Sequence, residues 1–258
     1  MRRGGRRRHQ PPGVSARSPG RGHSPPPHGL GNSIQILGRR RTAGVCLALL
    51  RQRRLHTDIC RLSGFGETKV IALQIKKAAS IRGKTLVLRN AVVTDASFIL
   101  SLRTNPQKSR HLSKVSDDLN AQIAWLINYE ERDTEAYFII EDVHGIPLGT
   151  VRIYDAQGDS FCWGSWILLK SAPTSAAIES ALIVYAYAVE SLGFQSAHFQ
   201  VQKANERVWR FHERFGAVRT AANEDQYEYK LSNAAIKSSM ERYRRYLPNG
   251  IVVKDCIK

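Results

Sequence analysis

The sequence predicts an α+β domain in which a mainly antiparallel sheet is flanked by helices, preceded by a basic, non-globular extension. Three apolar segments, 136–141, 147–154 and 161–169, are separated by short Gly-containing turns, a pattern typical of an antiparallel meander. Segments with helical periodicity precede and follow this meander. The basic residues concentrate at the start of the chain, which separates the extension from the domain.

Residues 1–80 carry 17 Lys and Arg against Asp58 and Glu67, and six of the ten prolines lie in the first 27 residues. Such a composition buries too little apolar surface to offset its ordering entropy, so we expect disorder there. Three interpretations stay open: a basic arm for nucleic acid or membranes, an organellar transit peptide, or an upstream translation absent from the native protein. Residues 81–258 are nearly neutral and have no basic stripe with stacking aromatics, which disfavours nucleic-acid binding by the domain.

Membrane insertion and metal binding are also disfavoured. The apolar run 45–50 is far shorter than the ~20 residues that cross a bilayer. The four cysteines are widely spaced, with no pairing to histidine that would suggest a zinc site and no disulfide framework. We therefore expect no metal and a reducing, cytoplasmic setting. The cysteines are Cys46, Cys60, Cys162 and Cys256.

The first elements of the domain are a strand and two helices. Residues 85–92 alternate as a strand, Thr94 is expected to cap the first helix, and Ser116 the second. Two aspartates follow Ser116 in the first turn, where they complement the helix dipole. The expected apolar faces comprise Phe98, Ile99 and Leu102 in the first helix, and Leu119, Ile123, Leu126 and Ile127 in the second.

After the meander, residues 173–192 predict one long helix that ends at Gly193. A strand at 197–202 leads to a short helix that Asn205 caps and Gly216 ends. Strands at 217–220 and 226–231 complete the domain. We therefore assign 1–80 to the extension, 81–232 to the domain, and 233–258 to a polar tail with at most one surface helix near 239–246.

The order of these elements and the segment 205–216, Asn-Glu-Arg-Val-Trp-Arg-Phe-His-Glu-Arg-Phe-Gly, resemble the GCN5-related N-acetyltransferase (GNAT) superfamily. The resemblance covers about residues 85–232. It looks closest to the RimJ/RimL-like branch, and in particular to nucleotide-linked amino-sugar N-acetyltransferases of the PseH type. In those proteins the first helix ends in a pattern matched here by Leu102-Arg-Thr-Asn-Pro106.

The resemblance implies acetyl-CoA as co-substrate. In the family, the pantetheine pairs with the backbone of a splayed strand, which maps to 166–169, and the pyrophosphate lies on amides at the start of the next helix. This chain lacks the glycines of that start, but it has hydroxyls and small residues there. Glu179 would repel a pyrophosphate unless it turns away. The candidate cofactor-binding residues are Leu168, Leu169, Ser171, Thr174, Ser175, Ala176, Ala177 and Asn205.

Resemblance also suggests the catalytic and acceptor residues. His212 stands where the family has a Tyr that protonates the departing thiolate, and an imidazole can donate a proton near neutral pH. Arg103 and Asn105 lie in the region that covers the acceptor. No general base is evident among Glu141, Asp142, Asp155 and His111, and water can serve instead. The aromatic candidates for stacking on a base or sugar are Trp125, Tyr137, Trp163 and Trp166.

The favoured hypothesis is direct acetyl transfer to a primary amine without a covalent intermediate, with a nucleotide-linked amino sugar as acceptor. One alternative is acetylation of a protein N-terminal amine, as in RimJ/RimL-like enzymes. A second is a degenerate, non-catalytic binding module of the same fold. A third is a nucleic-acid binder that works through its basic extension. A homodimer is a further hypothesis.

Overall fold

The computed structural model describes residues 73–256 except 110, 112 and 114. The predictions for residues 1–72, including the disordered extension and its three interpretations, lie outside this part of the chain. Within it, nine strands form one sheet in the order β7-β8-β6-β5-β4-β3-β2-β1-β9. All neighbouring strands are antiparallel except β5 and β6, which are parallel. The predicted mainly antiparallel α+β fold is confirmed.

The strands are β1 (Ala78–Arg82), β2 (Leu86–Asn90), β3 (Ala136–Asp142), β4 (Pro147–Gln157), β5 (Ser160–Leu168), β6 (Ser196–Gln202), β7 (Val218–Ala222), β8 (Gln226–Ser232) and β9 (Val252–Asp255). The helices are η1 (Val93–Asp95), α2 (Ala96–Thr104), α3 (Pro106–Ser109), α4 (Leu119–Glu130), α5 (Ala176–Ala186), η2 (Tyr187–Ser191), α6 (Glu206–Arg214), α7 (Asn233–Arg242) and η3 (Arg244–Tyr246). No helix among the described residues is long and apolar enough to span a membrane.

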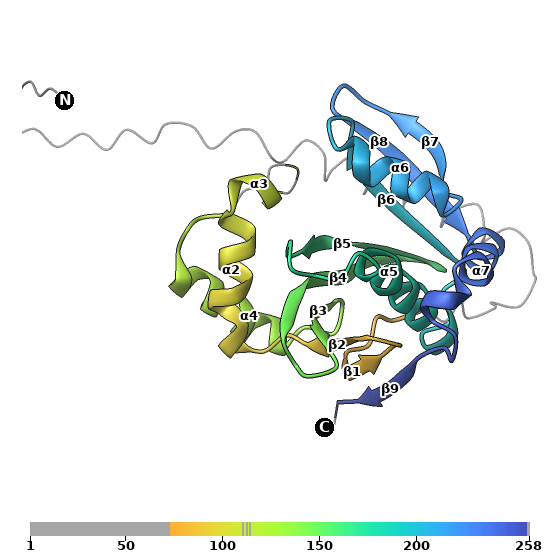
Figure 1. Ribbon diagram of the computed structural model, residues 1–258. Helices are drawn as coiled ribbons and strands as arrows, with labels where there is room; N and C mark the ends of the chain where they lie inside the picture. The colour runs from red at the N-terminus through yellow and green to blue at the C-terminus, as the bar shows by residue number, and fades with distance from the viewer. Residues whose placement is uncertain (1–72, 110, 112, 114, 257–258) are drawn as a thin grey trace, which may run out of the picture. The chain divides into compact units, whose positions relative to one another are not determined.

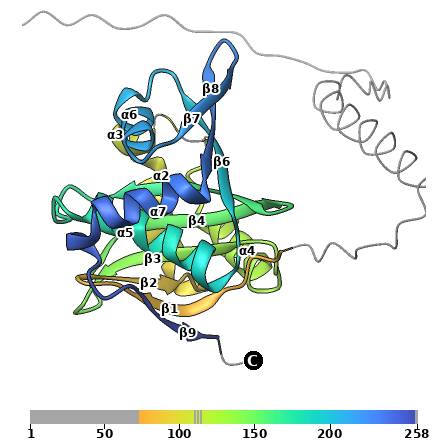
Figure 2. The ribbon, with the colours of Figure 1, turned by 90° about the vertical axis from the view of Figure 1, so that its right-hand side faces the viewer.

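Helices cover both faces of the sheet (Figure 1). Tyr137 and Ile139 of β3 pack with residues of α2 and α4, while Phe138 and Ile140 belong to the core that contains α5. Because side chains alternate along a strand, β3 is buried from both sides. Figure 2 shows α5 lying across one face of the sheet. Nearly every residue of α5 is buried, so this helix forms the centre of the larger core.

Several predicted element ends are corrected. The N-cap of α4 is Asp118 and not Ser116, since the Asp118 carboxylate accepts hydrogen bonds from the amides of Asn120 and Ala121. Leu119 and Ile127 are exposed, contrary to the predicted face, whereas Leu126 is buried as predicted and Tyr129 is buried with it. These hydrogen bonds fix a helix start two residues later than predicted.

The cap of the first helix is also corrected. Thr94 lies inside η1, and the Asp95 carboxylate accepts a hydrogen bond from the amide of Val92. The predicted helix 173–192 starts at Ala176 and its last turn is the π-helix η2, after which Gly193 adopts φ 84° as a stop residue.

The sheet extends beyond the predicted bounds of 81–232 at both ends. β1 begins at Ala78, and β9 lies inside the segment predicted as a polar tail. These two strands pair with each other, with Ala78 opposite Asp255. α7 is capped by Ser232 and buries Ser239, whose hydroxyl donates to the Phe215 carbonyl at 2.8 Å. Residues 233–255 are thus part of the fold.

The sheet divides between β5 and β6. Their parallel pairing is limited to Ser160 with Ser196 and Phe161 with Ala197, and beyond it the two strands diverge (Figure 1). A bulge in β5 lies just after the divergence begins, where Ser165 adopts φ 47°. Gly149 of β4 permits this bulge, because a Cβ there would lie 2.1 Å from the Ile167 carbonyl oxygen.

Candidate active site

A cavity of about 690 Å³ lies where β5 and β6 diverge, and we call it the split pocket. It is bounded by the end of β5, the start of α5 and one face of α6. Of the candidate cofactor residues, Leu168, Leu169, Thr174 and Ala177 line it, whereas Ser171, Ser175, Ala176 and Asn205 do not. Its lining residues are Trp166, Leu168, Leu169, Lys170, Ala172, Pro173, Thr174, Ala177, Ile178, Arg207, Val208, Phe211, Arg214, Phe215 and Tyr243.

The start of α5 lies at one end of the split pocket. The N-cap residue Ser175 makes no side-chain cap bond. First-turn amides of a helix lack intrahelical acceptors and carry the positive end of the dipole, so they can bind phosphate. Thr174 and Ala177, on either side of this helix start, both line the cavity. Ala177 thus lies at the cavity, whereas Ala176 is buried and its amide donates to the Pro173 carbonyl.

Three cations also line the split pocket, and the sequence prediction missed all of them: Lys170, Arg207 and Arg214. None of them forms an ion pair with a residue that the structure describes. No acidic residue within the described ranges lines the cavity. Arg207 and Arg214 are seven residues apart on α6 and so share one helix face, a spacing that was visible in the sequence. The cavity suits a polyanionic ligand with an apolar arm.

Glu179 turns away from the split pocket. Its carboxylate accepts hydrogen bonds from the Thr85 amide and hydroxyl, both at 2.6 Å, and from the Leu86 amide at 3.0 Å. The residue is 1% exposed. It therefore anchors the start of β2 and does not oppose an anion at the start of α5.

Asn205 holds the N-cap position of α6, but its side chain makes no cap bond. Its carbonyl accepts hydrogen bonds from the amides of Val208 and Trp209. The predicted side-chain cap is thus wrong, while the predicted helix is confirmed. The contribution of Asn205 to cofactor binding stays a prediction.

His212 lies inside an aromatic cluster and lines none of the cavities described here. Its ring centroid is 4.2 Å from that of Phe199 and 5.3 Å from that of Trp163. Nδ1 is buried without a hydrogen-bond partner among the described residues. Burial lowers the pKa of His212 to about 3, so the imidazole is neutral at physiological pH.

We expect His212 to make the stability of the protein depend on pH. An unfolded histidine takes up a proton near pH 6.5, whereas folded His212 does so only near pH 3, so stability falls as the pH drops through this window. The loss amounts to about 2 kcal/mol at pH 5. Urea unfolding of the wild type and His212→Phe at pH 7 and pH 5 measures it, since carboxylate effects common to both cancel. Equal losses of stability in the two proteins would refute the assignment.

A second cavity, of about 320 Å³, lies on the opposite side of β5, and we call it the arginine pocket. Arg103 faces into it, donating to the Ser165 hydroxyl at 3.3 Å and to the Ser113 carbonyl at 3.0 Å. Ser165 lines this cavity and the next residue, Trp166, lines the split pocket, so β5 is the partition between them. Its lining residues are Ile99, Arg103, Ser113, Val115, Gln122, Trp125, Tyr137, Arg152, Tyr154 and Ser165.

The other acceptor candidate, Asn105, is the C-cap of α2 and accepts a hydrogen bond from the Gln107 amide. It does not line the arginine pocket. Of the aromatic candidates, Trp125 and Tyr137 line that cavity and Trp166 lines the split pocket. Trp163 is buried in the core, where its indole donates to the Tyr185 hydroxyl.

The candidate bases lie elsewhere. Glu141 is paired with Arg89, the Asp142 carboxylate accepts amides of its own turn, and Asp155 contacts His198. His111 contacts Gln202. No carboxylate in the described part of the chain lines the arginine pocket, and burial raises the pKa of Tyr137 there. The described residues also contain no group of three or more side chains that could hold a metal ion.

The structure thus combines two diverging parallel strands, a helix start at their split and a cationic cavity beside them. The family described as acetyltransferase (GNAT) domain matches residues 85–218, more than half of the chain. The chain belongs to the GNAT family, and the protein is an N-acetyltransferase.

Solved structures agree with this assignment. Apo FdhC, described as a nucleotide-linked sugar GNAT, is 36% identical, with a TM-score of 0.59 over 69% of this chain and 99% of that chain. A GCN5-related N-acetyltransferase from Brucella melitensis is 16% identical, with a TM-score of 0.57. The match covers 67% of this chain and 88% of that chain. The spermidine N-acetyltransferase from Vibrio cholerae, solved with CoA and spermine, is 16% identical, with a TM-score of 0.52. The match covers 59% of this chain and 98% of that chain. The last two support the fold alone. No curated protein matches the sequence.

Proposed function

We propose that this enzyme transfers an acetyl group from acetyl-CoA to the primary amine of a nucleotide-linked amino sugar. The observation that carries the choice of acceptor is the arginine pocket. Arg103 and Arg152 line it without a carboxylate among the described residues, and Trp125 offers an aromatic face beside them. Guanidinium groups bind phosphates in a two-pronged geometry, and an aromatic ring can stack on a sugar or base. The 36% identity to a nucleotide-linked sugar GNAT supports the same acceptor class.

The split pocket is the proposed site of acetyl-CoA. Its apolar walls suit the pantetheine arm, and the start of α5 with Lys170, Arg207 and Arg214 suits the phosphates. The thioester would then lie near the bulge of β5. At this point only the strand β5 separates the split pocket from the arginine pocket. Backbone amides of the unpaired edge of β5 are the proposed donors to the oxyanion.

The proposed reaction is direct. The amine nitrogen attacks the thioester carbonyl, a C–N bond forms, the C–S bond breaks, and the thiolate leaves. The amine loses its proton to water, because no carboxylate in the described part of the chain lines the arginine pocket. The predicted role of His212 as proton donor to the thiolate stays a proposal, and it has two requirements: the ring must leave its buried position toward the split pocket, and it must take up a proton there, because the buried imidazole is neutral.

The arginine pocket also bears on the alternative acceptor. A guanidinium that faces into the cavity favours an acceptor with a phosphate over a peptide amine, and Arg103 faces into the arginine pocket. The free thiols of Cys162 and Cys256 support the proposed cytoplasmic setting. A homodimer and the acetyl donor itself remain proposals.

The test has two stages. First, the melting temperature of the full chain is measured with increasing acetyl-CoA, which must raise it if the folded state binds the cofactor. Second, acetyl transfer is measured to dTDP-linked and UDP-linked amino sugars and to peptides with free N-termini. Turnover of a nucleotide sugar that Arg103→Gln weakens is the expected result. Turnover of peptides alone would establish the RimL-like alternative, and acetyl-CoA binding without turnover of either acceptor would establish the non-catalytic module.

A further inference from the structure

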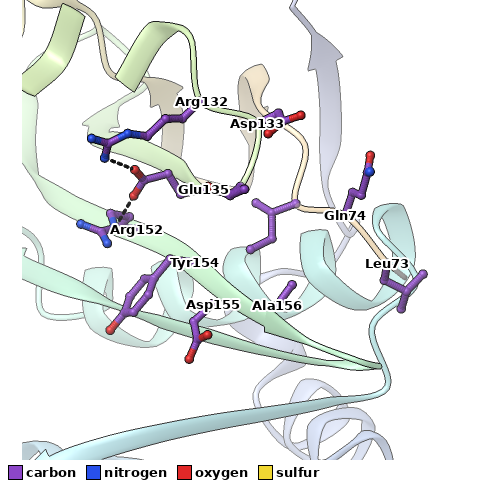
Figure 3. Close-up of a pocket in the computed structure, with 11 residues that line it drawn as sticks. Leu73, Gln74, Arg132, Asp133, Glu135, Arg152, Tyr154, Asp155 and Ala156 are labelled. Atoms are coloured by element: carbon purple, nitrogen blue, oxygen red, sulfur yellow. Dashed lines mark hydrogen bonds and ion pairs between the residues drawn. The ribbon is translucent and has the colours of Figure 1, made fainter. Parts of the chain in front are cut away.

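A third cavity, of about 530 Å³, adjoins the arginine pocket, and we call it the hairpin pocket (Figure 3). It is lined by the first described residues 73–75, by the loop 132–135 between α4 and β3, and by the end of β4. Arg152 and Tyr154 line both this cavity and the arginine pocket. The two cavities therefore meet across a pair of side chains on the same face of β4.

Arg152 is held in place from two sides. The buried Glu135 carboxylate lies between Arg132 and Arg152, 2.9 Å from Nη1 of the first and 2.8 Å from Nε of the second (Figure 3). On its other side, the Arg152 guanidinium lies 4.5 Å from the centroid of the Tyr154 ring. The contact of Nε with Glu135 is an ion pair by distance but not a hydrogen bond by geometry, and no hydrogen bond among the described residues uses a terminal nitrogen of Arg152. The guanidinium edge opposite Glu135 is thus positioned to bind a phosphate.

The polar groups differ between the arginine pocket and the hairpin pocket. The arginine pocket has no described carboxylate, whereas the hairpin pocket adds Asp133, Thr134 and Asp155 as acceptors. A phosphate is favoured beside Arg103 and Arg152, and hydroxyl or N–H donors are favoured beside Asp133 and Asp155. From the split outward, the cavities therefore favour a phosphate first and hydrogen-bond donors after it. A sugar linked through diphosphate to a nucleoside has its groups in the same order: the diphosphate follows the sugar, and the nucleoside with its N–H and hydroxyl donors follows the diphosphate.

The length of the path fits as well. The amine must lie near Ser165, next to the split. Arg152 pairs with Gly164, and Tyr154 pairs with Cys162, two residues farther along β5; Gln157, just beyond the hairpin-pocket residues of β4, pairs with Ser160. Five residues of strand from Ser165 to Ser160 span about 16 Å. An acceptor that occupies both cavities must therefore extend over a distance of this order.

We infer that the hairpin pocket is the nucleoside subsite of the acceptor, that Arg152 binds the diphosphate, and that Glu135 is a positioning residue for Arg152. This inference rests on the proposed acceptor class. It adds a second cavity to the acceptor site, and it assigns the recognition of the nucleoside to Asp133 and Asp155.

The test measures binding of dTDP, UDP and inorganic pyrophosphate to the full chain by calorimetry. Arg152→Ala should weaken all three by about tenfold or more, since a hydrogen bond to a charged group contributes about 1.5–3 kcal/mol. Asp155→Asn and Asp133→Asn should weaken only the two nucleotides, because these two carboxylates line the nucleoside end of the hairpin pocket and neither is paired with Arg152. Glu135→Gln should weaken the nucleotides several-fold and leave acetyl-CoA binding unchanged.

Asp95→Asn is the matched control for Glu135→Gln. Asp95 is also a largely buried carboxylate paired with an arginine, Arg89 at 2.9 Å, but it lines none of the three cavities. Nucleotide affinity that survives Arg152→Ala, or that falls equally in Asp95→Asn, overturns the inference. If an amine acceptor is acetylated but neither nucleotide competes with it, acetyl transfer stands and the nucleoside subsite is refuted. If acetyl-CoA fails to bind while the nucleotides bind through Arg152, the proposed function fails and the subsite remains.

Discussion

Replacing both Arg207 and Arg214 by alanine is expected to weaken acetyl-CoA binding by a factor of about 100 or more. Both guanidinium groups line the split pocket and lack an ion-pair partner among the described residues, so a bound phosphate would be their first charged partner. Each hydrogen bond to a charged group contributes about 1.5–3 kcal/mol, and 1.4 kcal/mol corresponds to a factor of ten in affinity. Calorimetric titration of the full chain with acetyl-CoA measures the loss.

Arg210→Ala is the matched control on the same helix. Arg210 does not line the split pocket, and it is paired with Glu206 on the exposed side of α6. Its replacement should leave acetyl-CoA affinity within a factor of two or so, because exposed pairs contribute about 0–1 kcal/mol. An equal loss in Arg210→Ala would show that general surface charge, and not the split pocket, attracts the cofactor. Binding by the wild type should also weaken with salt.

Glu179→Ala is expected to destabilise the protein by about 3–5 kcal/mol, because it leaves two backbone amides and one hydroxyl at the start of β2 without their acceptor. The carboxylate is 1% exposed, so water does not readily replace it. Urea unfolding at neutral pH measures the change. In a domain of this size the melting temperature should fall by roughly 10 °C.

Two further variants sharpen this test. Glu190→Ala changes an exposed carboxylate at the end of the same helical segment and should alter stability by less than about 0.5 kcal/mol. Glu179→Gln keeps one acceptor oxygen, should lose less stability than alanine, and should bind acetyl-CoA like the wild type because the side chain faces away from the split pocket. A clear gain in acetyl-CoA affinity in Glu179→Gln would contradict the observed orientation.

Local patterns predicted much of the fold. The meander of β3, β4 and β5, the helix after Asn205 and the stop at Gly216 follow from alternation, turn residues and helix ends, all of which are local in sequence. The pairing of β1 with β9 could not be predicted this way, because it joins segments at opposite ends of the domain. The start of α4 was misplaced because Ser116 and Asp118 are both good N-caps, and only hydrogen bonds distinguish them.

The roles of the site residues predicted from sequence stay predictions, but the structure shows where these residues lie. β5 and β6 diverge after Phe161, before the predicted segment 166–169, and Arg103 lines a cavity. The burial of His212 depends on Phe199 and Trp163, which come from two other strands, so the helical pattern alone could not reveal it. Lys170 and Arg152 reach their cavities from the end of one strand and the middle of another, and neither carries a local signature.

The pairing of β1 with β9 has a consequence for how the chain is made and folded. Ala78 contacts Asp255, so the outer edge of the sheet forms only after nearly the whole domain has left the ribosome. Contacts between such distant segments raise the contact order and slow folding. Until β9 arrives, the outer edge of β1 is open to strands of other chains. Synthesis that stalls before residue 252 should therefore yield a product prone to aggregation, even though the lining residues of all three proposed ligand cavities precede that point.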